Sequence, residues 1–396
     1  MKRIVVTGIG AVTPIGNSAT EYAESLKNGV LGLSDITRFD TSGLSKRAFQ
    51  VTGFEPPPFA KIHDPFIQYV FRAVEEALRD SGLDLSQLDR DRVGIAVSSS
   101  KGGMMTFERF YGSFLKHPSA LLAARVYANF PPNLAAQWIA RHWEFFGPAK
   151  TVSAACATGL YSVMEGIRMI EQDEADFCIA GAGDASVTRL MLAGYRQMGV
   201  LSMGHMRPFD ARRDGFLIGE GAGIVILESE ESAHARGASV YGRVLSYAYG
   251  FESFHPYALS AESDGLTRCL KQVLRTAGIN ASDIEYLNVH GTATRQGDLY
   301  ETRQIKSAFG KAAYHIPMSS TKSLVGHMIG ASGVVELIAC LVAMRDSFIP
   351  PTANLEQVDP ECDLDYTPLR SKEQEVKIAC SISMGFGGQL GAILFA

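Results

Sequence analysis

The sequence lacks several features that would place it in a simple class of protein. It has no excess of basic residues, since 37 Lys and Arg stand against 42 Asp and Glu, and the formal net charge is -5. Nucleic-acid-binding proteins normally carry a basic balance, so that class is disfavoured. It also has no long hydrophobic run, because the longest apolar segment, residues 333–344, contains Glu336 and is too short for a bilayer. We therefore expect no nucleic-acid partner and no membrane span.

Paired or clustered cysteines are also missing. The six cysteines are scattered, mostly within apolar segments, and none has the CxxC spacing of a zinc site. We interpret them as buried, reduced thiols of a cytoplasmic protein rather than as a disulfide framework. The first residues favour a strand over a signal peptide, because only three apolar residues follow the N-terminal charges.

Hydrophobic periodicity predicts an α/β fold. Short apolar runs that fit strands alternate with amphipathic stretches that fit helices. The expected strands cover residues 4–7, 93–97, 177–180, 224–227, 286–289, 378–382 and 392–395. The expected helices include residues 66–83, 159–172 and 266–277. This alternation favours a mostly parallel sheet with helices on both faces.

One segment occurs twice in related form. Residues 78–88 and 274–284 each end a helix, pass through a glycine and a polar turn, and lead into an apolar strand. The matched positions keep a constant offset close to half of the chain. We predict a duplicated α/β unit whose two copies face each other, so that strand-end loops from both surround one site.

Cys156 lies where a strand-like segment turns into an apolar-periodic helix. Small neighbours, Ala154, Ala155, Ala157 and Gly159, permit a sharp turn from which the sulfur projects. A helix N-terminus stabilises a thiolate and offers free backbone N–H groups beside it. Taken alone, the residue fits a small buried side chain as well as a nucleophile. The loops described next favour the nucleophile.

Two histidines lie on small-residue loops far downstream. His290 ends a strand and precedes a Gly-Thr-Ala-Thr loop, and strand ends are where α/β sheets bind ligands. His327 follows a glycine just before a helix. Each alone could be a core or capping histidine, and neither has metal-ligand spacing, so no metal is expected. Together with Cys156 they predict a thiol served by two imidazoles, and hence an acyl-transfer enzyme.

Glu336 is a charged residue in a helix, residues 333–344, that is apolar nearly all round and should be buried. A buried carboxylate is costly unless it is paired. Lys322, at the other end of the same loop, is the natural partner, and the alternative is a lysine that reaches solvent. A further loop, residues 385–388, places three glycines around Phe386. Such a loop can approach a ligand closely or move, although an ordinary turn is the alternative.

Together these residues resemble the β-ketoacyl-[acyl-carrier-protein] synthases, the decarboxylating condensing enzymes of the thiolase superfamily. The resemblance runs the full length and includes a block from Pro208 to Gly223 without evident chemistry of its own. The Cys-His-His set resembles the elongating class, because initiating synthases carry Asn where His327 stands and thiolases carry a second cysteine. The implied fold is α/β and thiolase-like, layered α-β-α-β-α with two mixed five-stranded sheets. Residues 1–239 would carry the cysteine, and residues 240–396 the His, Lys and His loops.

The resemblance implies a ping-pong reaction without a cofactor. Cys156 would take an acyl group from the phosphopantetheine thioester of acyl carrier protein. A malonyl carrier would then lose CO₂, and its carbanion would attack the acyl-cysteine to give a 3-ketoacyl product. His290 and His327 would donate to the developing negative oxygen. Lys322, paired with Glu336, would fix the field and the geometry at His327.

The same resemblance assigns roles to further residues. The backbone N–H groups of Cys156 and Phe386 would form the oxyanion hole, and Phe386 would also be a gate. Thr292 and Thr294 would hydrogen-bond the pantetheine arm. Phe107 falls near the position that sets the depth of the acyl pocket, where a bulky ring would favour shorter chains. A homodimer with the sheet continuing across the interface is expected.

The chain departs from the family pattern at several positions. Arg295 replaces a usual proline, Gly199 stands where an arginine is common, and Gln389-Leu390 replaces Thr-Asn. Residues 60–65 are poor in basic residues, so an acidic carrier should dock more weakly or on another surface. These differences predict a specialised pathway rather than bulk fatty-acid elongation.

Three alternatives remain. A coenzyme-A-dependent condensing enzyme or thiolase is disfavoured by His327 in place of a second cysteine. A non-catalytic partner subunit, as chain-length factors are, is disfavoured by Cys156 but kept open by the weak docking surface. A cysteine hydrolase is least favoured, because two imidazoles and a lysine exceed what hydrolysis needs.

Overall fold

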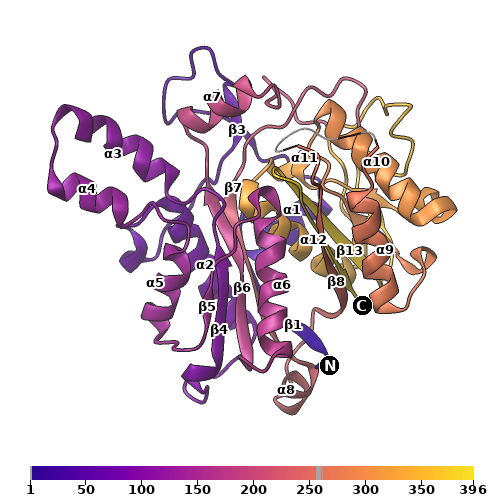
Figure 1. Ribbon diagram of the computed structural model, residues 1–396, viewed down its shortest axis with the longest axis horizontal. Coiled ribbons are helices and arrows are strands. Elements are labelled where there is room, and N and C mark those ends of the chain that lie inside the picture. Colours follow the sequence, from indigo (N-terminus) through magenta and orange to yellow (C-terminus); the bar gives the residue numbers. More distant parts are fainter. Residues whose placement is uncertain (1, 256–259, 261) are drawn as a thin grey trace.

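The computed structural model describes residues 2–255, 260 and 262–396, which form a ten-stranded mixed sheet built of two similar parts (Figure 1). The first part has the strand order β5 (Ala149–Lys150), β4 (Val93–Ser98), β6 (Phe177–Ala185), β7 (Glu220–Ser229) and β1 (Ile4–Val12). The second has the order β10 (Met318–Ser319), β9 (Tyr286–Asn288), β13 (Ala379–Gly385), β14 (Gln389–Phe395) and β8 (Gly242–Phe251). In each part the first two pairs are parallel and the last two antiparallel.

This repeated strand order confirms the predicted duplication. The two parts meet where β1 pairs antiparallel with β8 over two residue pairs. The related sequence segments occupy equivalent places, since they join α2 (Pro65–Asp80) to β4 and α9 (Gly265–Ala277) to β9. Gly82 and Gly278 both have positive φ angles, 64° and 70°, which explains why a glycine recurs at this turn.

The prediction of a mostly parallel sheet was wrong. Apolar runs report burial on both faces of a strand and carry no information about its direction. The turn at residues 385–388 joins β13 directly to β14, so these strands run antiparallel. The two mixed five-stranded arrangements that the family resemblance implied are the observed ones.

Helices form three layers around the two parts of the sheet (Figure 1). The middle layer contains α6 (Thr158–Glu171) and α12 (Ser332–Asp346), which pack against each other. On the outer faces, α2 and α5 (Leu134–Trp143) cover the first part, whereas α9 covers the second part and carries α10 (Arg295–Phe309). The side chains of α12 are buried from residue 332 to residue 343, as its all-round apolar sequence predicted. Because both helices lie in this middle layer, the turns that lead into α6 and α12 are also in the interior of the protein.

A helical hairpin, which the sequence analysis did not predict, follows β4. It consists of α3 (Met104–Lys116) and α4 (Ala120–Tyr127) and projects from the body of the molecule (Figure 1). None of the side chains of α4 is buried. The other short helices and strands are α1 (Ala19–Lys27), α7 (Arg189–Gln197), α8 (Glu230–Ala235), α11 (Lys322–Val325), β2 (Leu33–Asp35), β3 (Arg47–Phe49), β11 (Phe348–Ile349) and β12 (Lys372–Glu373). No helix within the described ranges is long and apolar enough to cross a membrane.

Candidate active site

One cavity of about 540 Å³ brings together loops from both halves of the chain. The first half contributes Cys156 and Phe216, and the second contributes loops at the ends of β9, α11 and β13. Six of the residues expected at the site line this cavity: Cys156, His290, Thr292, Thr294, His327 and Phe386. Residues far apart in the sequence thus meet where the duplicated units face each other.

Cys156 lies in a strained turn at the start of α6. The turn is a 3₁₀ segment, Ala155–Ala157, and Ala155 has a φ of 47°, which is unusual for a residue with a side chain. Gly385 packs so closely here that a Cβ on it would lie 2.4 Å from the carbonyl oxygen of Ala154. The backbone N–H of Phe386 lies close enough to the sulfur of Cys156 to lower the pKa of the thiol. The glycine loop and the cysteine turn therefore form one packed unit.

The expected stabilisation of the Cys156 thiolate is reversed in this structure. Burial raises the pKa of the thiol to about 11, because the charged form loses its contact with water. The positive charges of Lys101 and Lys322 and the Phe386 N–H lower the pKa and offset only part of this effect. For this buried thiol, the loss of solvation outweighs the stabilisation of the thiolate by these neighbouring groups.

His290 is fixed from two sides. The buried carboxylate of Glu301 accepts hydrogen bonds from the backbone N–H groups of His290 (2.6 Å) and Gly291 (2.8 Å). Lys322 donates to the carbonyl oxygen of His290 at 2.7 Å and lies 3.3 Å from its Nδ1. Burial and the charge of Lys322 hold the pKa of His290 well below its usual value, so the ring is neutral. With Nδ1 facing an ammonium group, the ring proton lies on Nε2.

The predicted ion pair between Lys322 and Glu336 is present, and both side chains are fully buried. The pair was expected to fix the geometry at His327, but Lys322 contacts His290 instead. The three donors of the ammonium group have three acceptors, namely Glu336 and the carbonyl oxygen and Nδ1 of His290. A buried charge with all its donors satisfied is a rigid anchor for the loop that carries His290.

His327 is oriented by the start of α12. The backbone N–H of Ile329 donates to Nδ1 at 3.2 Å, and the hydroxyl of Ser332 lies 3.0 Å from the same atom. An accepting Nδ1 places the proton of the neutral ring on Nε2. Burial and nearby lysines hold the pKa of His327 well below its usual value. The rings of His290 and His327 lie 5.7 Å apart and nearly perpendicular, so both can present an Nε2–H group to one oxygen.

Thr292 and Thr294 line the outer part of the cavity. Their hydroxyl groups lie 3.0 Å apart, and the Thr294 hydroxyl also accepts from the backbone N–H of Gly297, which caps α10. Phe107 is not among the residues that line this cavity; it stacks on Tyr111 within α3 and packs near Phe130. The structure therefore brings the threonines to the site and leaves Phe107 in the projecting hairpin.

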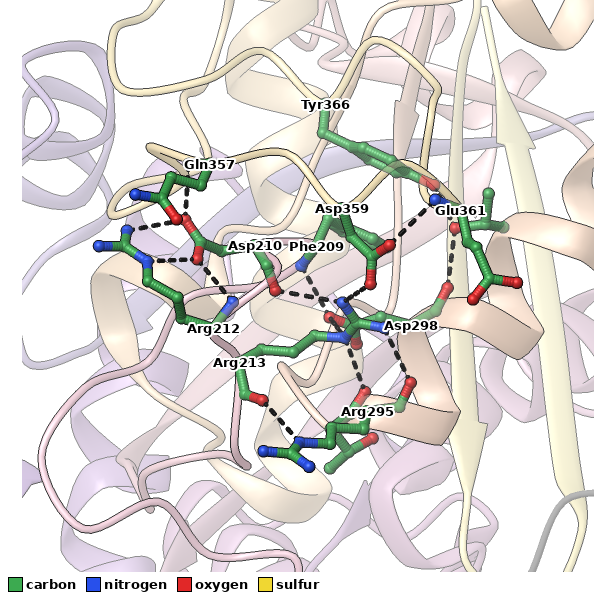
Figure 2. Close-up of polar contacts among 12 residues, drawn as sticks. Phe209, Asp210, Arg212, Arg213, Arg295, Asp298, Gln357, Asp359, Glu361 and Tyr366 are labelled. Atoms are coloured by element: carbon green, nitrogen blue, oxygen red, sulfur yellow. Dashed lines mark hydrogen bonds and ion pairs between the residues drawn. The ribbon is translucent and has the colours of Figure 1, made fainter.

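Sequence reasoning missed a buried arginine that holds the threonine loop in place (Figure 2). Arg213, which is 3% exposed, donates to the carbonyl oxygens of Thr294 (3.3 Å) and Arg295 (2.9 Å). It also pairs with the carboxylates of Asp359 at 2.6 Å and Asp298 at 3.7 Å. This network gives the block from 208 to 223 a structural role, because Arg213 ties the first half of the chain to the loop after β9.

Glu301, Asp184 and Lys101 were also missed. Asp184 is fully buried and accepts hydrogen bonds from the hydroxyl of Ser99 and from the backbone N–H groups of residues 100, 101 and 330. Burial raises its pKa to about 6 and that of Glu301 to about 8. For Asp184 the sequence signal was an acidic residue inside the otherwise apolar strand β6, the same kind of signal that revealed Glu336. Within the described residues, no cluster of His, Cys, Asp and Glu could hold a metal ion.

Comparisons with known proteins agree with this geometry. The β-ketoacyl synthase N-terminal domain family matches residues 1–233, and the C-terminal domain family matches residues 241–356. The chain is 36% identical to "3-oxoacyl-[acyl-carrier-protein] synthase 2" of Staphylococcus aureus and 35% identical to that of Coxiella burnetii; each match covers all of this chain and 98% of the relative.

Solved structures of ketosynthases are also similar to this chain. "The ishigamide ketosynthase/chain length factor" superimposes with a TM-score of 0.93 and 33% identity, covering all of this chain and 99% of the other. A β-ketoacyl synthase from Burkholderia phymatum superimposes with a TM-score of 0.90 and 29% identity, over all of this chain and 99% of that one. Fold and sequence thus define a condensing enzyme of the thiolase-like type, an acyltransferase. The chain belongs to the β-ketoacyl synthase family.

Proposed function

We propose that this chain elongates an acyl group by decarboxylative condensation with a malonyl group, both presented as thioesters by acyl carrier protein. The single observation that carries this proposal is the shared cavity of Cys156, His290 and His327. A thiol and two neutral imidazoles with outward Nε2–H groups match the two halves of the reaction, acyl transfer and carbanion formation.

In the first half-reaction, the sulfur of Cys156 attacks the acyl carbonyl carbon. A bond forms between this sulfur and the carbonyl carbon, the bond to the carrier sulfur breaks, and the carrier leaves as a thiol with the proton of Cys156. The backbone N–H of Phe386 lies beside the cysteine sulfur, so it is suited to donate to the oxyanion together with the N–H of Cys156.

In the second half-reaction, the malonyl thioester loses CO₂ and its oxygen becomes negative. His290 and His327 would both donate to this oxygen, which requires neutral rings with the proton on Nε2. The carbanion then attacks the acyl carbon on Cys156, the bond to the cysteine sulfur breaks, and the thiolate takes up a proton. Lys322 and Glu336 act as positioning residues, because Lys322 contacts His290 rather than the cavity.

The carrier would dock on a basic groove beside α2 and α3. A second cavity, of about 1150 Å³, is lined by Lys61, Arg109 and Arg125, none of which has a carboxylate partner within the described part of the chain. Residues 60–65 are poor in basic side chains, but the hairpin α3–α4 supplies the missing charge. An acidic carrier is steered by such a surface.

Three further parts of the proposal concern organisation. The chain divides into residues 1–239 and 240–396, which the repeated strand order supports. A second copy of the chain pairs along β5, which is the edge strand of the first part. The protein is cytoplasmic, in keeping with six free, buried cysteines.

The test is mass spectrometry of the protein after exposure to carrier protein loaded with acyl chains of several lengths. A mass increase of one acyl group that maps to Cys156 is expected, followed by release of a 3-ketoacyl carrier when malonyl carrier is added. Cys156→Ala should show no label. Cys269→Ala is the matched control, because Cys269 is also buried but does not line the cavity. A folded wild-type protein that takes no label would contradict the proposal and favour a partner subunit.

A further inference from the structure

The mouth of the catalytic cavity carries an arginine at a position where the family usually has proline. Arg295 lines the same cavity as Cys156, and its side chain is exposed. Along this loop the side chains go from buried His290 through Thr294, which is half-buried, to exposed Arg295. The loop therefore runs from the reacting end of the cavity to its opening, and Arg295 stands at the opening.

A hydrogen bond holds Arg295 in place, and this bond leaves its positive charge unpaired. Its Nε donates to the carbonyl oxygen of Arg213 at 3.3 Å, while Arg213 donates to the carbonyl oxygen of Arg295 at 2.9 Å. In Figure 2 the guanidinium of Arg295 points away from the carboxylates around Arg213. Its two terminal nitrogens have no hydrogen bond or ion pair to any described residue. The side chain is thus already partly ordered, so binding a ligand costs less of its conformational entropy.

Charges in the surrounding network single out Arg295. Arg212 is paired with Asp210 and Glu356, and Arg213 with Asp298 and Asp359. Asp214 and Glu252 also line the cavity, but neither lies within ion-pair distance of Arg295. Among the three arginines of this described network, Arg295 is the one without a carboxylate partner, so its positive charge is available to an anion.

We infer that Arg295 is a phosphate-binding residue that recognises the phosphate of the phosphopantetheine arm as it enters the cavity. This inference rests on the proposed function, which places the thioester end of the arm at Cys156 and the phosphate end at the opening. The planar guanidinium fork matches phosphate oxygens, and the two terminal nitrogens are the ones that remain to bind them. Coenzyme A carries the same phosphopantetheine, with additional nucleotide phosphates.

The test compares acyl thioesters of pantetheine and of 4′-phosphopantetheine, which differ only in the phosphate. The rate constant for acylation of Cys156 is followed by mass spectrometry. The wild-type protein should prefer the phosphorylated arm by about three- to tenfold, as expected for an exposed charge-assisted hydrogen bond. In Arg295→Gln this ratio should fall to about one, and Arg295→Lys should retain part of it. Arg303→Gln, a change at an exposed position on the same helix, should keep the wild-type ratio.

The outcomes separate this inference from the proposed function. Labelling of Cys156 by both thioesters with equal rates, or an unchanged ratio in Arg295→Gln, would overturn the inference and leave the proposed function intact. Failure of both thioesters to label the folded protein would overturn the proposed function and the inference with it. Acyl-coenzyme A is a third substrate. A loss in Arg295→Gln confined to it would assign Arg295 to the nucleotide phosphates and reject the phosphopantetheine phosphate.

Discussion

The turn before α6 and the turn before α12 occupy equivalent places in the duplicated fold, but they have different roles at the site. Both are three-residue 3₁₀ segments, Ala155–Ala157 and Ile329–Ala331, and each begins with a residue of positive φ, 47° and 52°. The first turn presents Cys156 to the cavity, whereas the second has Gly330 at the same place. The backbone conformation of the turn is duplicated, but the reactive side chain is present only in the first turn.

Packing explains why the second turn carries no side chain. A Cβ on Gly330 would lie 2.5 Å from a carboxylate oxygen of Asp184 and 2.8 Å from the Cβ of Ser100. The same carboxylate accepts a hydrogen bond from the N–H of Gly330 at 2.8 Å. Asp184 thus holds the second turn tightly against the first half of the chain. The turn orients His327 through the N–H of Ile329 rather than reacting itself.

Removing the side chain of the first turn makes the two turns alike and should have the largest effect. We expect Cys156→Gly to lower the condensation rate by a factor on the order of 10³ or more, because Cys156 is the one thiol among the described residues that line the cavity. Condensation is measured as 3-ketoacyl carrier formed per enzyme, with thermal unfolding as the check on folding. Activity within about tenfold of wild type would show that the reaction does not pass through Cys156.

The loop that carries His290 is anchored by the buried ion pair of Lys322 and Glu336, and breaking this pair should lower the stability of the protein. Lys322→Met leaves Glu336 buried without a partner, which should lower the free energy of unfolding by about 3–5 kcal/mol. Chemical denaturation measures this loss. The double variant Lys322→Met/Glu336→Gln removes both charges and should regain a substantial part of it. If the single and double variants are equally unstable, the charge pair is not what stabilises this loop.

The glycine of the second turn can be tested by adding one methyl group. Gly330→Ala should destabilise the protein by about 1–3 kcal/mol, because the new Cβ collides with Asp184 and Ser100. Gly194→Ala is the matched control, since Gly194 lies in α7 with nothing within 4 Å of its added Cβ, and it should be neutral or slightly stabilising. Equal effects of both substitutions would remove the packing explanation for the difference between the turns.

The smallest expected effect concerns the charge near the first turn. Below the pKa of Cys156, about 11, the thiolate fraction and the alkylation rate should rise about tenfold per pH unit. Lys101→Met removes a positive charge, raises the pKa and should slow alkylation by iodoacetamide by about two- to fivefold at fixed pH. High salt should reduce this difference. Lys116→Met, at the exposed end of α3, is the control; an effect of the same size there would exclude a local role for Lys101.

Much of the site could be predicted from particular residues. Cys156 among small residues, His290 at a strand end and an acidic residue in the apolar helix α12 each carry a local signal, and the structure brings the two loops to one cavity and pairs Glu336 with Lys322. The recurrence around Gly82 and Gly278 was sufficient to predict the duplication. Strand direction could not be predicted, because burial of a strand is independent of the direction in which its neighbour runs.

The sequence by itself determined which groups are available: the proposed nucleophile, the two imidazoles, the lysine and the repeated unit that sets them in two halves. Only the tertiary structure decided their states. It raised the pKa of Cys156 by enclosing the thiol, placed Lys322 on His290 rather than on His327, and made Arg213 the clamp of the threonine loop. These outcomes depend on desolvation and on contacts between residues far apart in the chain, and local sequence patterns do not record either of them.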